Sequence, residues 1–390
     1  MKTNASSARK AIWVIGAGAS VSDTDGHFPT LLQIPGRARE LGLITEDFVS
    51  EPELKGLAGY LKKRLYGDLT NPAEAIDLEH VLSLLEIDIA VSPEPNLLFA
   101  RKAVLRLLRS TLLRLSSSAP PLQGHYKRMV ASLGPRDTVI TFNWDTLLDD
   151  VFGRVERLAN AGANEQARPK FGRQSNRYDR FLMQLTGWGE RTIHGASIPP
   201  PVHSPEDVGY FIKAHGSVDW YYCTNPGCRA HETVFPMLGS KTRPVCSGCR
   251  ERTEVLIIPP TMNKRLRDLP LTRRLLTLAA AEMGQGSEVV VWGYSLPPTD
   301  FFSEWILRHA KSTRCKRLVL INPDVFEHDN GVTRLNAAFI SRFVRTLSRP
   351  GRTIQLEVYS NFNEFEASSS AAMSPGMTAQ LRRLARGQVD

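Results

Sequence analysis

The stretch Ala11-Ile12-Trp13-Val14-Ile15-Gly16-Ala17-Gly18-Ala19-Ser20 joins a short apolar run to a turn that contains two glycines. A continuous apolar run is typical of a parallel strand that is buried on both faces. Glycines after such a strand let the backbone approach a pyrophosphate, whose oxygens bind the amide groups of the next helix. The stretch therefore predicts the first strand of an α/β fold, although its turn alone is equally typical of an ordinary tight turn.

Further short apolar runs recur along the chain and are separated mostly by helical patterns or loops. They lie at residues 138–142, 210–213, 254–258, 288–292, 317–321 and 353–358. This alternation favours a doubly wound, Rossmann-type parallel sheet. The third glycine of the dinucleotide fingerprint and the acidic residue after the second strand do not occur at the expected spacing, which disfavours a standard dehydrogenase.

The first two predicted strands are separated by about 120 residues, which is too long for a single crossover. Helical periodicity at residues 78–90 and 97–115 predicts a helical insertion over about residues 40–135. The second of these helices combines a broad apolar stripe with a basic face. That pattern favours packing within its own domain over a contact between subunits.

The composition is that of a folded protein. In a chain of 390 residues, 42% are hydrophobic and 23% are charged. We expect one large domain over residues 1–365, an irregular connection over 153–204, and a flexible basic tail over 366–390. The net charge of +9 suits either nucleic acid or an anionic small ligand, so it leaves direct nucleic-acid binding open. The polar start without a long apolar stretch predicts a cytoplasmic protein with no membrane span.

Four of the five cysteines cluster in two pairs, Cys223 with Cys228 and Cys246 with Cys249. Each pair encloses turn-forming residues, so the two pairs are expected to deliver four thiolates tetrahedrally to a zinc ion. A site with four sulfur ligands has no open position for water or substrate. The sequence therefore predicts a structural zinc-ribbon module over about residues 218–255; unpaired thiols or disulfides are the alternatives.

Polar residues also follow two of the predicted strands. Thr141-Phe142-Asn143-Trp144-Asp145 places amide and carboxylate groups where open α/β sheets bind ligands. Taken in isolation, Asn143 or Asp145 is expected to cap the next helix. Ile212-Lys213-Ala214-His215-Gly216-Ser217 places a histidine at a second strand end, where a lone histidine is more often structural than catalytic.

The order of these motifs resembles that of the sirtuins. The shared series comprises the glycine turn, the Asn143 motif, His215-Gly216, the cysteine pairs, Gly293-Tyr294-Ser295 and Ile321-Asn322. The chain looks most like the bacterial sirtuin-like branch of NAD-degrading defence proteins, in which Thr-Phe-Asn-x-Asp and His-Gly-Ser replace the deacetylase versions. The resemblance spans residues 16–322 and implies a Rossmann-type domain that holds NAD across the carboxyl edge of its sheet, with a small zinc module.

The resemblance also implies roles for individual residues. It makes Asn143 and His215 catalytic and places Asp145 with Asn143 at the nicotinamide-ribose end of NAD. Of the remaining cofactor-binding residues it implies, Gly16, Gly18 and Ser20 would hold the phosphates, and Ser295 and Asn322 the adenosine side. Ala17 and Gly293 are also expected to bind the cofactor.

The sequence departs from deacetylases at three places. Phe142 stands where they carry glutamine, His27-Phe28-Pro29 replaces a Pro-Asp-Phe-Arg loop, and Ile258-Pro259-Pro260-Thr261 lacks their peptide-binding Phe-Gly-Glu. These departures favour NAD hydrolysis over an NAD-dependent deacylase; a non-catalytic sensor of NAD or ADP-ribose is a further alternative. By analogy with this branch, we expect a homo-oligomer, or a chain that works beside a HerA-like ATPase in antiphage defence.

Overall fold

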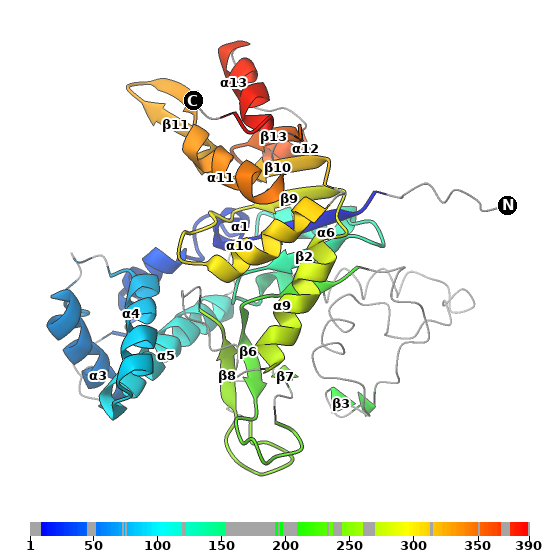
Figure 1. Cartoon of the computed structure of the whole chain (residues 1–390). Helices are drawn as coiled ribbons and strands as arrows, with labels where there is room; N and C mark the ends of the chain where they lie inside the picture. The colour runs from blue at the N-terminus through cyan, green and yellow to red at the C-terminus, as the bar shows by residue number, and fades with distance from the viewer. Residues whose placement is uncertain are drawn as a thin grey trace.

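The computed structural model describes residues 9–44, 52–71, 74, 76–118, 122–152, 192–193, 196–197, 209–231, 234–236, 244–259, 270–312, 315–349, 352–367 and 375–388. A six-stranded parallel sheet lies at the centre of these residues (Figure 1). Its strands, in spatial order, are β13 (Gln355–Tyr359), β10 (Arg317–Ile321), β9 (Glu288–Trp292), β1 (Ala11–Ile15), β2 (Thr138–Thr141) and β5 (Phe211–Lys213).

The strand order confirms the predicted Rossmann-type sheet. Numbered along the chain and read from β5, the six strands follow the order 3-2-1-4-5-6, which is that of dinucleotide-binding folds. The order reverses between β1 and β9, where Val14 pairs with Val291. Ligands bind open sheets of this kind at the carboxyl ends of the strands beside such a reversal.

The expected strand at residues 254–258 belongs to a different sheet, so its assignment to the central sheet is wrong. It forms β8 (Glu254–Ile257), which pairs antiparallel with β6 (Gly216–Tyr222), and β6 also pairs with β7 (Val234–Pro236). Gly216 explains the change of direction after β5: its φ is +76°, and a Cβ there would lie 2.1 Å from the carbonyl oxygen of Leu256. Only glycine fits this turn.

The described residues between β1 and β2 are largely helical. The helices are α1 (Ala17–Asp23), α2 (Ile34–Glu40), α3 (Pro52–Tyr60), α4 (Leu78–Val91), α5 (Pro95–Ser117) and α6 (His125–Ser132), with short helical turns at Leu31–Gln33 and Leu61–Leu65. Figure 1 shows α3, α4 and α5 grouped to one side of the sheet. The helices expected at 78–90 and 97–115 are confirmed as α4 and α5, and α5 packs its apolar stripe against α2, α3 and α4.

The C-terminal part surrounds the sheet with further helices. They are α9 (Pro270–Met283), α10 (Phe301–Arg308), α11 (Ala337–Leu347), α12 (Phe362–Glu366) and α13 (Pro375–Ala385), with helical turns at His309–Ser312 and Pro323–Val325 and a hairpin of β11 (Phe326–Asp329) and β12 (Val332–Leu335). Among the described helices, none is long and apolar enough to cross a membrane.

The expected flexible tail is wrong for residues 375–385, because they form α13. Leu381 and Leu384 are buried, and the helix packs on α11 and β13. Apolar residues at helical spacing therefore outweigh the serine- and proline-rich stretch that precedes them. The irregular connection expected over 153–204 lies outside the described residues, apart from the short strands β3 (Thr192–Ile193) and β4 (Ala196–Ser197).

Candidate functional site

The turns after β1 and β9 touch each other at the point where the strand order reverses. Gly16 N donates to the Trp292 carbonyl over 3.0 Å, and Gly18 N donates to the Gly293 carbonyl over 2.8 Å. A Cβ on Gly16 would lie 2.5 Å from Gly293 O, and one on Gly293 would lie 2.0 Å from Ala19 N. Close packing of the two backbones therefore requires glycine at these positions. This requirement is independent of the phosphate contact predicted for Gly16 and Gly18.

Asn143 joins the β2 end to the glycine turn. Its Nδ2 donates to Gly16 O over 3.1 Å and to Ser20 Oγ over 3.0 Å, and Ser20 Oγ donates to Asp145 Oδ2 over 2.8 Å. The phenol of Tyr126 lies 2.8 Å from Ser20 Oγ. The structure thus brings together Gly16, Ser20, Asn143 and Asp145. It adds Tyr126, which lies in no motif recognised in the sequence.

A buried charge pair lies behind this group. Lys213 Nζ donates to Asp149 Oδ2 over 2.7 Å and to the Asp145 carbonyl over 2.6 Å, and its side chain is fully buried. Burial raises the pKa of Asp149 to about 7, while the charge of Lys213 opposes the rise. Burial also raises the pKa of Asp145, again opposed by Lys213. The charge of Lys213 therefore stabilises the ionised forms of both Asp145 and Asp149.

His215 follows β5 and is 3% exposed. Its Nε2 lies 3.2 Å from Ser303 Oγ and 3.3 Å from Asp300 Oδ2, both at the start of α10. Asp300 is the N-cap of α10 and accepts hydrogen bonds from Ser303 N over 3.3 Å and from the Tyr294 phenol over 3.0 Å. Sequence reasoning missed Asp300 and Ser303, although an aspartate before a helical apolar pattern is an N-cap signal.

Phe142 connects the two groups of polar side chains. Its ring centroid lies 4.9 Å from that of His215 and 4.6 Å from that of Tyr294. Asn143, the next residue along the chain, is 8% exposed. Asn143, His215 and the residues they contact are called the strand-end site below; these contacts are Gly16, Ser20, Tyr126, Phe142, Asp300 and Ser303. The structure brings its two predicted catalytic side chains to the carboxyl ends of neighbouring strands, β2 and β5.

The predicted adenosine-side residues differ in their surroundings. Asn322 is buried, donates to the Tyr294 carbonyl over 3.4 Å and accepts from Asp324 N over 2.9 Å. Ser295 is exposed, and its carbonyl accepts a hydrogen bond from Arg342 over 3.2 Å. Asn322 therefore lies against the β9 turn, whereas the Ser295 side chain faces solvent.

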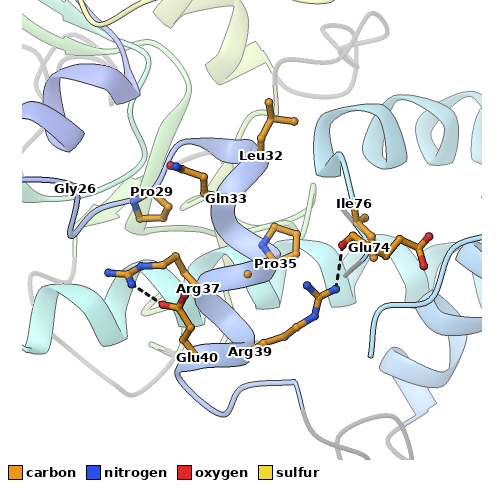
Figure 2. A pocket seen from close by; sticks show the side chains of 11 residues that line it. Gly26, Pro29, Leu32, Gln33, Pro35, Arg37, Arg39, Glu40, Glu74 and Ile76 are labelled. Carbon is orange, nitrogen blue, oxygen red and sulfur yellow. Dashed lines mark hydrogen bonds and ion pairs between the residues drawn. The ribbon is translucent and has the colours of Figure 1, made fainter. Parts of the chain in front are cut away.

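Two cavities lie elsewhere on the described surface, and neither is lined by Asn143 or His215. Figure 2 shows the first, of about 440 Å³, which lies around α2 and the preceding turn. Arg37 pairs with Glu40 in this cavity, and Arg39 donates to the Glu74 carbonyl. The second, of about 540 Å³, lies beside the cysteines.

The four predicted metal ligands converge. The sulfur atoms of Cys223, Cys228, Cys246 and Cys249 all lie within 4.8 Å of one another. Two of the separations, between Cys223 and Cys249 and between Cys228 and Cys246, are 3.7 Å. Zinc–sulfur bonds of about 2.3 Å in a tetrahedron place sulfurs about 3.8 Å apart, so the donor set fits a structural zinc. These cysteines with β6, β7 and β8 are called the cysteine module below.

No family model and no curated protein matches the chain. Solved Sir2 structures are similar to it at low identity. A Sir2 mutant with a p53 peptide and NAD is 16% identical, over 80% of this chain and 81% of that one, with a TM-score of 0.27. A Sir2 homologue mutant with 2′-O-acetyl ADP ribose is 14% identical, over 82% of each chain, with a TM-score of 0.32. The likeness is to the family that the motifs resemble, and it assigns no activity.

Proposed function

We propose that the chain is an NAD glycohydrolase, which breaks the bond between nicotinamide and C1′ of the ribose and gives nicotinamide and ADP-ribose. The observation that supports this most is the gathering of Gly16, Asn143 and His215. They follow the three neighbouring strands β1, β2 and β5. The carboxyl ends of these strands, beside the order reversal, are where open α/β sheets bind ligands.

The reaction builds positive charge at C1′, so the site has to bind the oxocarbenium-like transition state more tightly than NAD itself. Asn143 holds the ribose or the attacking water, and Asp145 supports Asn143 through Ser20. The water oxygen bonds to C1′ as the C1′–N bond breaks, and nicotinamide leaves as a neutral molecule. His215 accepts the proton that the water loses.

The rest of the dinucleotide would follow the turns at the order reversal. The phosphates would lie on Gly16, Ala17, Gly18 and Ser20, and the adenosine toward Gly293, Ser295 and Asn322. Because Asn143 and His215 are each less than 10% exposed, NAD can reach them only when neighbouring side chains move apart. We therefore expect turnover to depend on conditions that open this edge of the sheet.

The wider role that we propose is depletion of NAD in antiphage defence in the cytoplasm. It rests on the resemblance of the Asn143 and His215 motifs to the NAD-degrading branch. The chain would then act as a homo-oligomer or together with a HerA-like ATPase, and the cysteine module would carry a structural zinc.

The test measures release of nicotinamide from NAD by the purified chain, alone and with the products of neighbouring genes. Asn143→Ala and His215→Ala should each lower kcat by about 10²–10⁴-fold. Asn336→Ala, at the N-cap of α11, and His328→Ala, on the exposed hairpin, are matched controls and should leave kcat unchanged.

Three results would contradict the proposal. Equal release by all variants would remove the roles of Asn143 and His215. Release only in the presence of an acetylated peptide would identify a deacylase. Binding of NAD or ADP-ribose without turnover under all these conditions would identify a sensor.

A further inference from the structure

The hydrogen-bond pattern at the start of α10 fixes the state of the His215 ring. Ser303 Oγ donates its single hydrogen to Asp300 Oδ2. It can therefore only accept from His215 Nε2, which lies 3.2 Å away. The neutral ring thus carries its proton on Nε2, and Nδ1 is the basic nitrogen.

Asp300 is held in place from several directions. Its side chain is buried and accepts hydrogen bonds from Ser303 N and from the Tyr294 phenol. Burial, together with the charge of Asp300, raises the pKa of Tyr294 well above its usual value, so the phenol stays a neutral donor. These donors and the N-terminus of α10 stabilise the charged form of the carboxylate.

We propose that Asp300 is a positioning residue for His215, which fixes the ring through Ser303 and stabilises the imidazolium that forms when His215 accepts a proton. The inference rests on the proposed function and names a third participant in that reaction. The geometry supports it directly: Asp300 Oδ2 lies 3.3 Å from His215 Nε2, and both side chains are at most 3% exposed. A carboxylate that contacts one ring nitrogen sets the tautomer and favours the protonated ring.

Among the described residues, two further charged groups near this part of the site have interactions of their own. Lys213, two residues earlier, bonds to Asp149 and the Asp145 carbonyl. The charge of Glu79, on α4, contributes to the raised pKa of the Tyr294 phenol. Asp300 contacts the ring directly, so removing its charge should change the titration of His215.

Asp300→Asn separates this role from helix capping, because asparagine caps a helix about as well as aspartate. The variant should fold and should lower kcat by about 10²-fold or more, with little change in KM. Loss of the nearby negative charge favours the neutral ring. The acid limb of the pH profile of kcat should therefore move to lower pH by about one unit.

The matched control is Asp77→Asn. Asp77 caps α4 and accepts hydrogen bonds from Glu79 N and His80 N, so this variant also removes a charge at a helix N-terminus. It should leave kcat and its pH profile unchanged. If Asp300→Asn behaves in the same way, Asp300 is only a cap and the inference is overturned.

A second measurement keeps this inference separate from the proposed function. NMR titration of the His215 ring in the full chain needs no substrate. Asp300→Asn should lower its midpoint by about one pH unit relative to the unsubstituted chain. An unchanged midpoint overturns the inference even if the enzyme is active. A lowered midpoint in a chain that releases no nicotinamide supports the pairing and refutes the proposed function.

Discussion

The cysteine module and the strand-end site both bring polar side chains into close contact, but different forces hold them there. In the cysteine module, four sulfurs from residues 223–249 lie within 4.8 Å of one another. Four thiolates at such distances repel each other, and a bound cation offsets the repulsion. In the strand-end site, Asn143 and Ser20 each meet a hydrogen-bond partner supplied by the protein.

The difference indicates what each region depends on. The folding of the cysteine module should depend on its metal, because modules of this type gain folding free energy when they bind the ion. The order of the strand-end site should depend on backbone packing, because the turns after β1 and β9 leave no room for a Cβ. Substitutions can therefore disturb one region and leave the other in place.

The largest expected effect is loss of the metal. Cys246→Ser should abolish the one zinc per chain that we expect, because binding free energies at structural zinc sites are about 10 kcal/mol or more. Elemental analysis would measure the zinc, and limited proteolysis would report whether residues 223–249 become accessible. The central sheet should keep its resistance to protease.

Cys315→Ser is the matched control. Cys315 is buried before β10, and burial raises the pKa of its thiol to about 11. This variant should retain all of the zinc. Equal zinc content in the Cys246 variant and in the unsubstituted chain would show that the ion does not hold the module together.

A smaller but still large effect, on the free energy of unfolding, is expected from substitution of Gly293. Gly293→Ala adds a Cβ at 2.0 Å from Ala19 N, in a residue whose φ is +65°. Backbone overlap and positive φ together should lower the free energy of unfolding by about 3–4 kcal/mol. Gly331→Ala has a φ of +78° but nothing within 4 Å, and should cost only about 1 kcal/mol. Urea denaturation of both variants checks this, and equal costs would contradict the packing argument.

The smallest expected effect is a dependence of folding stability on pH that comes from Asp149. Burial raises the pKa of Asp149 from 3.8 to about 7, so between these values the folded chain binds more protons at this group than the unfolded chain. This stabilising contribution is complete below about pH 4 and is lost as the pH rises through 7. Asp149→Asn removes it, so from pH 5 to pH 8 the unsubstituted chain should lose about 2 kcal/mol of stability relative to the variant.

Urea denaturation at both pH values measures the difference. Asp150→Asn changes the exposed neighbouring acid and is the matched control. Lys213, Asp219 and Asp145 also act on Asp149 and are the same in all these chains. If the Asp149 and Asp150 variants respond to pH alike, the buried acid is not the source of the dependence.

The sequence predicted the central strands well, because each is a short apolar run and parallel strands are buried on both faces. It predicted the convergence of the cysteines for a similar reason, since their spacing is local. The strand at 254–258 could not be assigned to its sheet from its own residues. Its place depends on Gly216, which reverses the chain nearly forty residues earlier.

The candidate site was predicted in part. Asn143 stands directly after one predicted strand and His215 two residues after another, so the parallel topology alone brings them to one edge. Tyr126, Asp300 and Ser303 come from helices whose position is set by packing, and no local pattern shows which strand end they meet. The turn after β1 is expected to face the phosphates and the turn after β9 the adenosine side, whereas in the structure the two turns also contact each other.

The helix α13 has a consequence for assembly. It packs on β13, one outer strand of the sheet, while the opposite outer strand, β5, has only three residues. Long, uncovered outer strands are the usual starting points for pairing between chains, and covering or shortening them suppresses it. Any association between copies of this chain is therefore expected to use side-chain surfaces rather than edge-to-edge pairing of their sheets.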